Sequence, residues 1–253
     1  MLCKWEDLPE KLQTDVVKPY YDRLDSHRAQ LAIKRTFDIL VSLFGILFFS
    51  PIFLITAIAI KLDTPGPVFY RQERVTQYGR IFKIFKFRSM SVNADTGANL
   101  TIKNDSRITK TGKIIRKLKI DELCQFIDVL IGNMTLVGTR PEVQEYVNKY
   151  TDEMMATLLL PAGITSKASI IYKNESELLE NAENPKAIYL EKILPEKMKY
   201  NLDGIAKFGI TNEARLLFMT VFALLGKDYT EETLSERETA ESKWKTMIKS
   251  LLP

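Results

Sequence analysis

The longest apolar stretch of the chain runs from Ile39 to Ile60, where 22 consecutive residues carry no charge. A helix of that length would be about 33 Å long, enough to cross a hydrocarbon core of about 30 Å. Pro51 follows Ser50 in the middle of the stretch, and a proline inside a helix removes one backbone donor and bends the chain. The pattern therefore predicts a membrane helix broken at Ser50-Pro51 into two arms, each too short to cross.

Basic residues flank this stretch on both sides, with Lys34 and Arg35 before it and Lys61 after it. Lys and Arg collect on the cytoplasmic side of membrane segments, so both ends are expected in the cytoplasm. A re-entrant hairpin that dips into the bilayer and returns agrees with the flanks and with the break. We expect the Ser50 hydroxyl to bond to backbone groups that Pro51 leaves free. A buried core helix and a single crossing are the alternatives.

Three further segments have helical periodicity. Apolar residues recur every four positions near the N-terminus and predict an amphipathic, interfacial helix: Leu8, Leu12, Val16, Tyr20 and Leu24. Leu216 to Leu225 is a run of ten residues, too short to cross, that fits a core helix or an interfacial one. The charged tail from Lys227 to Pro253 has helically spaced apolar residues, which suggests a surface for a partner or a membrane: Trp244, Met247, Ile248 and Leu251.

Between these segments the pattern predicts a β-hairpin and a long helix. The turn residues Thr64 to Pro67 precede two extended stretches, Val68 to Tyr70 and Arg80 to Met90. Gly112 to Ile131 carries an apolar stripe at helical spacing and ends at Gly132-Asn133. The expected fold is therefore α+β and mostly helical, a membrane-associated monotopic domain with a Ser-Pro-broken re-entrant helix and a small β-hairpin.

Charge is unevenly spread along the chain. Lys61 to Lys119 holds fourteen Lys or Arg and four Asp or Glu, a net charge of +10, although the whole chain carries only +4. Such a basic block predicts an anionic partner, and its position directly after the apolar stretch favours lipid head groups and phosphates over nucleic acid. The single His and two Cys exclude a two-histidine zinc site and a disulfide framework. We therefore expect chemistry based on carboxylates, Arg and Lys.

Within the predicted helix, Asp121, Gln125 and Asp128 follow i, i+4, i+7 spacing and share one face, with Glu122 beside it and Arg116 about one turn earlier. Two carboxylates near cationic side chains suit phosphate chemistry with Mg²⁺, because a carboxylate can hold the metal while Arg neutralises phosphate charge. An ordinary exposed Asp-Glu pair explains the same spacing. The sequence contains neither the nucleotide loop G-x-x-x-x-G-K-[ST] nor the dinucleotide fingerprint G-x-G-x-x-G.

The order of these motifs resembles the bacterial sugar transferases, the monotopic phosphoglycosyl transferases that start glycoconjugate assembly. The resemblance covers about Lys34 to Ile171 and rests on the apolar run with its Ser-Pro and on these stretches: D-T-P-G-P-V-F-Y-R-Q-E-R-V, F-K-F-R-S-M, K-I-D-E-L-C-Q-F and G-T-R-P-E-V. It implies transfer of a phosphosugar from a UDP-sugar to polyprenol phosphate, such as undecaprenyl phosphate, with release of UMP. It also implies a location on the cytoplasmic face of the bacterial inner membrane.

The resemblance assigns roles to individual residues. Asp121 matches the nucleophile of the family, and Glu122 matches the acid that helps to hold Mg²⁺, so both carboxylates are candidate metal ligands. Arg116 matches an arginine that contacts phosphate. We place Arg88 and Gln125 with it as substrate and phosphate contacts.

Three positions depart from the family pattern. Arg140 lies in Thr139-Arg140-Pro141, where the family has Pro-Arg-Pro for nucleotide binding. The family element P-G-I-T-G appears as Pro161 to Ser166, with an inserted Ala and with Ser in place of Gly. Cys124 replaces a Pro, a change that removes no polar group and should be tolerated. The first two changes affect the expected nucleotide and sugar contacts.

The expected organisation has four parts. These are an N-terminal amphipathic helical segment over 1–33, the re-entrant membrane helix over 34–62, the catalytic domain over 63–200 and a helical tail over 201–253. Membrane lipid is an expected partner, and a homodimer stays open. The competing hypothesis is a non-catalytic, membrane-anchored adaptor that binds anionic lipid through its basic block.

Overall fold

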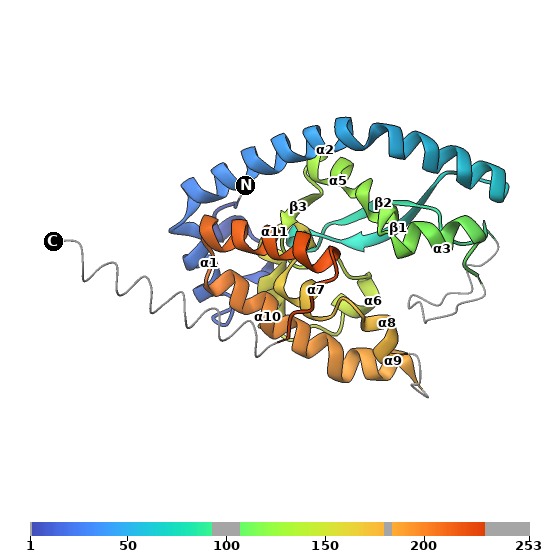
Figure 1. The fold of residues 1–253 in the computed structure, drawn as a ribbon. Helices are drawn as coiled ribbons and strands as arrows, with labels where there is room; N and C mark the ends of the chain where they lie inside the picture. Colours follow the sequence, from blue (N-terminus) through green and yellow to red (C-terminus); the bar gives the residue numbers. More distant parts are fainter. Residues whose placement is uncertain (1, 93–106, 180–183, 231–253) are drawn as a thin grey trace.

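Helices make up most of the computed structural model, which describes residues 2–92, 107–179 and 184–230 (Figure 1). The α-helices are α1 (Lys18–Asp25), α2 (Arg28–Asp63), α3 (Lys110–Lys117), α4 (Ile120–Leu123), α5 (Gln125–Ile131), α6 (Gln144–Val147), α7 (Lys167–Ile171), α8 (Glu175–Leu178), α9 (Pro185–Ile188), α10 (Leu194–Ala206) and α11 (Ile210–Leu224). The strands are β1 (Phe69–Val75), β2 (Ile81–Phe87), β3 (Met134–Val137) and β4 (Ala162–Thr165). Short 3₁₀ helices cover Trp5–Asp7, Glu10–Leu12, Gln77–Gly79 and Met154–Leu159, and a π-helical segment covers Tyr189–Ile193. The prediction of a mostly helical fold with a small hairpin is confirmed.

The hairpin forms where the sequence predicts it. β1 and β2 are antiparallel and pair from Phe69 opposite Phe87 to Val75 opposite Ile81. A buried carboxylate, which the sequence pattern placed in the candidate site, fastens this hairpin to α5: Asp128 Oδ2 accepts a hydrogen bond from the Phe85 amide at 2.7 Å. Asp128 is therefore a structural residue that sets the position of β2.

A second, parallel pair of strands was not predicted. β3 and β4 are each four residues long, too short to show the alternation by which a strand is identified from sequence. Their backbones come so close that a Cβ on Gly163 would lie 2.2 Å from the backbone of Gly138. Glycine is required there, because no other residue allows this approach. The pair brings the Pro161–Ser166 element beside the loop that contains Arg140.

The apolar stretch forms a single helix, so the predicted interruption at Ser50-Pro51 is wrong, whereas the re-entrant topology stays a prediction. α2 is continuous over 36 residues, and Figure 1 shows it arching over the rest of the molecule. Ser50 Oγ donates a hydrogen bond to the carbonyl of Leu47 at 2.7 Å. That carbonyl is the one that an N–H at position 51 would have reached, so the hydroxyl replaces the bond lost to Pro51 and keeps the helix continuous. The expected role of the Ser50 hydroxyl is confirmed.

By length and composition, α2 could cross a membrane. Only 17% of its most apolar window is buried in the protein, so most of this apolar surface is left exposed. Large apolar side chains along its outer side are more than 60% exposed: Leu40, Phe44, Leu47, Phe48, Leu54, Ile55 and Leu62. A soluble protein rarely exposes so continuous an apolar surface. The alternative of a buried core helix is therefore wrong.

The inner side of α2 carries polar anchors near its N-terminal end. Arg35 donates to the last carbonyls of α5, those of Val129 and Leu130, at 2.6 and 2.9 Å. Asp38 accepts from Thr135 Oγ1 at 2.5 Å and from the Leu136 amide at 3.2 Å in β3. The sequence pattern indicated that Arg35 is a basic flank of a membrane segment. Its hydrogen bonds to α5 correct that interpretation in part. Its charge neutralises the negative end of α5.

The neighbouring cation, Lys34, is buried as well. Its Nζ donates to the Val137 carbonyl at 2.9 Å and pairs with Glu213 of α11. Burial raises the pKa of Glu213, and the charge of Lys34 opposes that shift. Lys34 therefore joins three segments that are far apart in the sequence, α2, β3 and α11, instead of facing the cytoplasm as a free charge.

The N-terminal residues do not form the predicted amphipathic helix. Two 3₁₀ turns and α1 replace it, since Pro9 and Pro19 lack the N–H groups that a continuous helix would need. Leu8, Leu12 and Leu24 are at most 4% exposed and share one core with residues from 147 to 160 and from 202 to 208. This segment is packed into the domain rather than placed at a membrane surface.

The apolar run near the C-terminus lies in α11, whose exposed side favours the interfacial alternative. Only Met219 of this helix is buried, while Phe218 and Leu224 are 69% and 65% exposed. The predicted tail helix with Trp244 falls mostly on residues 231–253, outside the described residues. The four domain boundaries stay predictions.

Candidate functional site

The predicted helix over 112–131 consists of three short helices. Lys119 has a left-handed backbone (φ 55°) between α3 and α4, and Cys124 separates α4 from α5. A left-handed conformation costs about 1–2 kcal/mol for a residue other than glycine. Cys124 keeps right-handed helical angles (φ −68°, ψ −9°), so Asp121 and Asp128 both still face β2, Asp121 at Lys86 and Asp128 at the Phe85 amide. Gly132 ends α5 in the left-handed conformation as predicted (φ 87°).

Asp121 is buried but not fully bonded. The residue is 4% exposed, and its Oδ1 has no hydrogen-bond partner among the described residues. Its Oδ2 lies 3.4 Å from Lys86 Nζ. A buried carboxylate oxygen without a partner is costly unless a ligand satisfies it. This oxygen is therefore the group of the site that is available for chemistry.

Glu122, by contrast, is held on both oxygens. Arg140 binds it through two parallel hydrogen bonds, one from Nη1 to Oε2 at 3.1 Å and a shorter one from Nη2 to Oε1. Lys86 Nζ lies 3.5 Å from the same Oε1. Burial disfavours the charged form, but the charges of Arg140 and Lys86 outweigh it and hold the pKa of Glu122 well below its usual range. Glu122 in turn raises the pKa of Arg140. This pair is ionised at neutral pH.

Lys86 also belongs to the candidate site, although the sequence did not point to it. It lies on β2 between the two carboxylates and is in contact range of both. A signal was present: Lys86 shares the inward register of the strand with buried Phe82 and Ile84, where an apolar residue is expected. A charged residue at such a position needs a specific partner, and here the partner is the Asp121-Glu122 pair.

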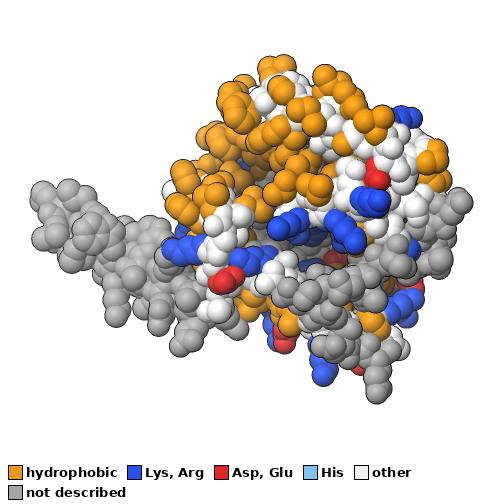
Figure 2. Space-filling model, turned by 45° about the vertical axis from the view of Figure 1, so that its right-hand side comes forward, with side chains coloured by type: hydrophobic (Ala, Val, Ile, Leu, Met, Phe, Trp, Pro, Cys, Tyr) orange, Lys and Arg blue, Asp and Glu red, His pale blue; other side chains and the backbone are white. Residues whose placement is uncertain are grey.

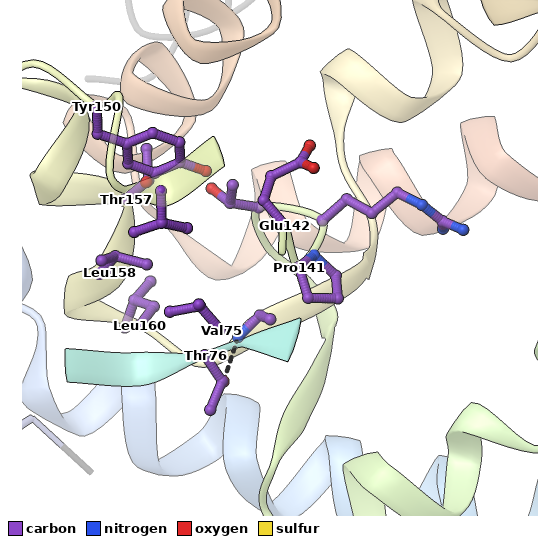
Figure 3. A pocket seen from close by; sticks show the side chains of 12 residues that line it. Val75, Thr76, Pro141, Glu142, Tyr150, Thr157, Leu158 and Leu160 are labelled. Carbon is purple, nitrogen blue, oxygen red and sulfur yellow. Dashed lines mark hydrogen bonds between the residues drawn. The ribbon is translucent and has the colours of Figure 1, made fainter. Parts of the chain in front are cut away.

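The loop that presents Arg140 is fixed at both ends. The Gly163 amide donates to the Thr139 carbonyl at 2.8 Å, and the Val75 amide donates to the Glu142 carbonyl at 2.9 Å. Behind this loop lies a cavity of about 10 Å³, with Pro141 and Glu142 on one side and Tyr150 on the other (Figure 3). A space of that size holds at most one water, so it cannot take a nucleotide. The two altered motifs, Thr139–Pro141 and Pro161–Ser166, are adjacent in space.

Both Nη atoms of Arg88 bind backbone carbonyls, a geometry that does not favour the predicted phosphate contact. Its guanidinium donates to the carbonyls of Thr64 at 2.7 Å and Pro65 at 2.5 Å, and it lies 3.5 Å from that of Ile60. These carbonyls lie in the last turn of α2 or just after it. The last carbonyls of a helix have no partner within the helix and carry partial negative charge. Arg88 therefore caps α2 and links its C-terminal end to the hairpin.

Arg116 and Gln125 keep their predicted roles as hypotheses. Arg116 is half-buried near the C-terminal end of α3, a short distance along the chain from Asp121. Gln125 is 1% exposed, and neither its Oε1 nor its Nε2 has a partner among the described residues. A buried amide with no partner suits contact with a ligand.

Cys124 donates from Sγ to the Asp121 carbonyl at 3.3 Å, and burial raises its pKa to about 12, so the thiol is neutral.

Opposite charges balance in this cluster, since Lys86 and Arg140 match Asp121 and Glu122. Among the described residues no group of three or more His, Cys, Asp or Glu gathers as a metal site. On one face of the molecule, Lys and Arg side chains gather at the edge of a hollow below a broad apolar area (Figure 2). The arrangement offers one carboxylate oxygen beside fixed cations, which suits attack on a phosphorus atom.

Comparison with known proteins agrees with this chemistry. The sequence model of the family "Bacterial sugar transferase" matches residues 29–227. UDP-glucose:undecaprenyl-phosphate glucose-1-phosphate transferase of Escherichia coli (strain K12) is 33% identical over 218 residues, which cover 84% of this chain and 44% of the relative. UDP-N-acetylgalactosamine-undecaprenyl-phosphate N-acetylgalactosaminephosphotransferase of Aeromonas hydrophila is 44% identical over 144 residues, which cover 55% of this chain and 34% of the relative. The chain thus spans less than half the length of these two relatives. The extent of the family match shows that the chain belongs to the bacterial sugar transferase family.

Proposed function

We propose that this protein transfers a phosphosugar from a UDP-sugar to polyprenol phosphate, releasing UMP, as the first membrane step of polysaccharide or glycoconjugate assembly. The names of the relatives specify undecaprenyl phosphate as the acceptor, and we extend that acceptor to this chain. The observation that carries the proposal is the Asp121 carboxylate, buried beside Lys86 with one oxygen unpartnered. It occupies the position of the family nucleophile.

The reaction proceeds in two displacements. The Asp121 carboxylate attacks the phosphorus that bears the sugar; a bond from Oδ to phosphorus forms, the bond to the bridging oxygen breaks, and UMP leaves with that oxygen. A phosphate oxygen of the polyprenol phosphate then attacks the acyl-phosphate, forming the diphosphate and releasing the carboxylate. Covalent catalysis divides one difficult transfer into two easier ones. Lys86, which lies beside the Asp121 carboxylate, can neutralise charge that develops on the phosphate oxygens, and we assign Arg116 the same role from its place in the family motif.

The carboxylate pair also fits Mg²⁺. This ion keeps several waters and is usually bound by one or two carboxylates together with substrate phosphates. The unpartnered Oδ1 of Asp121 is a donor of the required kind, and Glu122 lies next to it. When bound, the metal would neutralise the diphosphate of the nucleotide. Because Glu122 is already bonded to Arg140, we assign it to positioning Arg140 as well as to the metal.

The covalent step is tested by mass. Purified protein given UDP-sugar and Mg²⁺ without lipid acceptor should gain the mass of one phosphosugar, on the peptide that contains Asp121. The first displacement can proceed alone, so the adduct should build up and then disappear when polyprenol phosphate is added. Rapid quenching followed by intact-protein and peptide mass spectrometry provides the measurement. Absence of an adduct in protein that releases UMP with acceptor present would favour direct transfer.

Arg116 is expected to matter more than the lysines around it. Arg116→Ala should lower kcat/KM for UMP release by about 10- to 100-fold, because a guanidinium in a fixed position can bind phosphate through two parallel hydrogen bonds. Lys117→Ala and Lys119→Ala each remove one equal charge from exposed positions and should cost less than about threefold. Equal losses in the three variants would mean that the block acts only as a general basic field.

We also infer that the protein is monotopic, on the cytoplasmic face of the inner membrane. Two contacts support this. Near its N-terminal end α2 is bound to α5 and β3 through Arg35 and Asp38, and at its C-terminal end it is bound to the hairpin through Arg88. A helix whose two ends attach to one folded domain cannot leave those ends on opposite sides of a bilayer. The exposed apolar side of α2 then enters the lipid while the domain stays outside.

Cysteine labelling tests this topology. Single cysteines at Ser26 and Lys149, both exposed, are introduced in a chain whose Cys3 and Cys124 are replaced. In intact cells a membrane-impermeant thiol reagent should label neither position, and both should react after lysis. A cysteine in a periplasmic protein serves as the positive control. Labelling of Ser26→Cys in intact cells would mean that α2 crosses the membrane.

A further inference from the structure

The exposed side of α3 combines lysines with large aliphatic residues. Five residues at i, i+3, i+4, i+7 and i+8 spacing, all exposed, form what we call the α3 face: Lys110, Lys113, Ile114, Lys117 and Leu118. Ile114 and Leu118 are each 61% exposed, although helices of soluble domains turn such side chains inward. The inward side of α3 is occupied instead by Gly112 and Ile115. The two exposed aliphatic residues therefore take no part in the packing of the core.

This face adjoins the end of the apolar helix. The Thr111 amide donates to Asp63 Oδ2 at 2.9 Å, which joins the first turn of α3 to the last residue of α2. Lys61 and Leu62 are exposed at that end of α2, Leu62 at 83%. Figure 1 places α3 beside the C-terminal end of α2 and α10 on the side of the molecule away from α2. α3 thus lies against the C-terminal end of the helix assigned to the membrane.

The charge of α3 is of one sign. Residues 107–120 contain six Lys or Arg and no Asp or Glu. Asp63, a carboxylate that contacts the helix, accepts from the Thr111 amide, and this bond, further hydrogen bonds from Thr109 and Thr111 and the charge of Lys110 lower its pKa. A neutral surface would leave Lys113 and Lys117 without counter-charges, and a nucleic acid would leave Ile114 and Leu118 in water. A bilayer with anionic head groups has negative charge at its surface and apolar chains beneath. It therefore matches both the lysines and the aliphatic residues of the face.

We propose that the α3 face binds anionic phospholipid head groups and makes the protein select negatively charged bilayers. Ile114 and Leu118 enter the boundary between head groups and acyl chains, and Lys110, Lys113 and Lys117 extend to the lipid phosphates. The inference rests on the proposed function only for the placement of the protein on a membrane. It adds a lipid preference and a second contact, separate from α2.

Vesicle flotation of the full chain tests the proposal. Wild-type protein is compared on vesicles of phosphatidylcholine alone and on vesicles with about 30% phosphatidylglycerol, an anionic surface that attracts lysines. We expect a clear preference for the anionic vesicles that weakens as salt rises. Lys113→Gln with Lys117→Gln should lower binding to anionic vesicles by about tenfold or more, since each lysine near the surface contributes roughly a fivefold factor. Binding to neutral vesicles should change little.

The matched control removes two exposed lysines from the opposite side, Lys192→Gln with Lys199→Gln, and should bind as the wild type does. Ile114→Ser with Leu118→Ser should weaken binding to both kinds of vesicle. Equal binding of the wild type to neutral and anionic vesicles would overturn the proposal, as would equal losses in the two lysine pairs. UMP release by detergent-solubilised protein is measured separately. Its absence would refute the proposed function, whereas its persistence in Lys113→Gln/Lys117→Gln confines any loss to lipid binding.

Discussion

Asp121→Asn should abolish turnover, lowering UMP release by at least about 1,000-fold. The amide has nearly the shape of the carboxylate, so the buried site should keep its structure, but it cannot act as the nucleophile. The side chain is 4% exposed, and Lys86 lies 3.4 Å from its Oδ2. The measurement is UMP release with saturating UDP-sugar, Mg²⁺ and polyprenol phosphate, together with the mass of the protein after exposure to UDP-sugar. Neither UMP above background nor a phosphosugar adduct is expected.

The control for this variant is Asp128→Asn. Asp128 is also buried and acidic, but its Oδ2 accepts from the Phe85 amide, a bond that the oxygen of Asn can keep. Burial raises the pKa of Asp128, with that amide opposing the shift, so loss of the charge should cost little. We expect near-normal activity and a loss of stability of about 1 kcal/mol. Substantial UMP release by the Asp121→Asn protein would refute the nucleophile assignment.

Lys86→Met should give the second largest effect, a fall in kcat/KM of about 100-fold. The lysine lies 3.4 and 3.5 Å from oxygens of Asp121 and Glu122, so its removal leaves two neighbouring carboxylates with Arg140 as the only remaining described cation in contact. The variant then has no ammonium beside Asp121 to neutralise the charge that develops on the phosphate oxygens. Steady-state rates of UMP release measure the loss.

Lys83→Met is the matched control for Lys86→Met. Lys83 lies on the same strand, but its side chain is 61% exposed and is 3.9 Å from Glu73, a surface pair worth little. Its replacement should leave the rate unchanged. Lys86→Arg should restore part of the activity, because it keeps the charge but not the length of the side chain. Equal rates in Lys83→Met and Lys86→Met would mean that the contact with the carboxylates is incidental.

Several features could be predicted because they depend on residues close together in the sequence. The length of the apolar stretch predicted α2, alternation and turn residues predicted the β1–β2 hairpin, and Gly132-Asn133 predicted the end of α5. The Ser50 hydroxyl was expected to compensate for Pro51, since the carbonyl concerned is only three residues away. Asp121-Glu122 was recognised from its motif, and its functional role stays a prediction.

The positions of the site cations depended on contacts between distant segments. Lys86 and Asp121 are brought together by packing of β2 on α4 and α5, and Arg140 reaches Glu122 because β3 pairs with β4. Arg88 belongs to a recognised motif, yet the carbonyls at the end of α2 occupy it. Sequence spacing describes only neighbours within a few residues, so it could not distinguish an arginine that caps a helix from one that binds a phosphate.

The sequence by itself determined the family, the apolar helix and the carboxylate pair, because each is encoded in a local run of residues. Only the tertiary structure decided that both ends of α2 attach to one domain. It also decided that the N-terminal segment is core, with Leu8, Leu12 and Leu24 buried against residues more than 100 positions away. Lys34 illustrates the physical reason: its charge suggested a membrane flank, but its partner Glu213 is 179 residues distant. Burial and pairing of charges are properties of the packed chain, and no local pattern contains them.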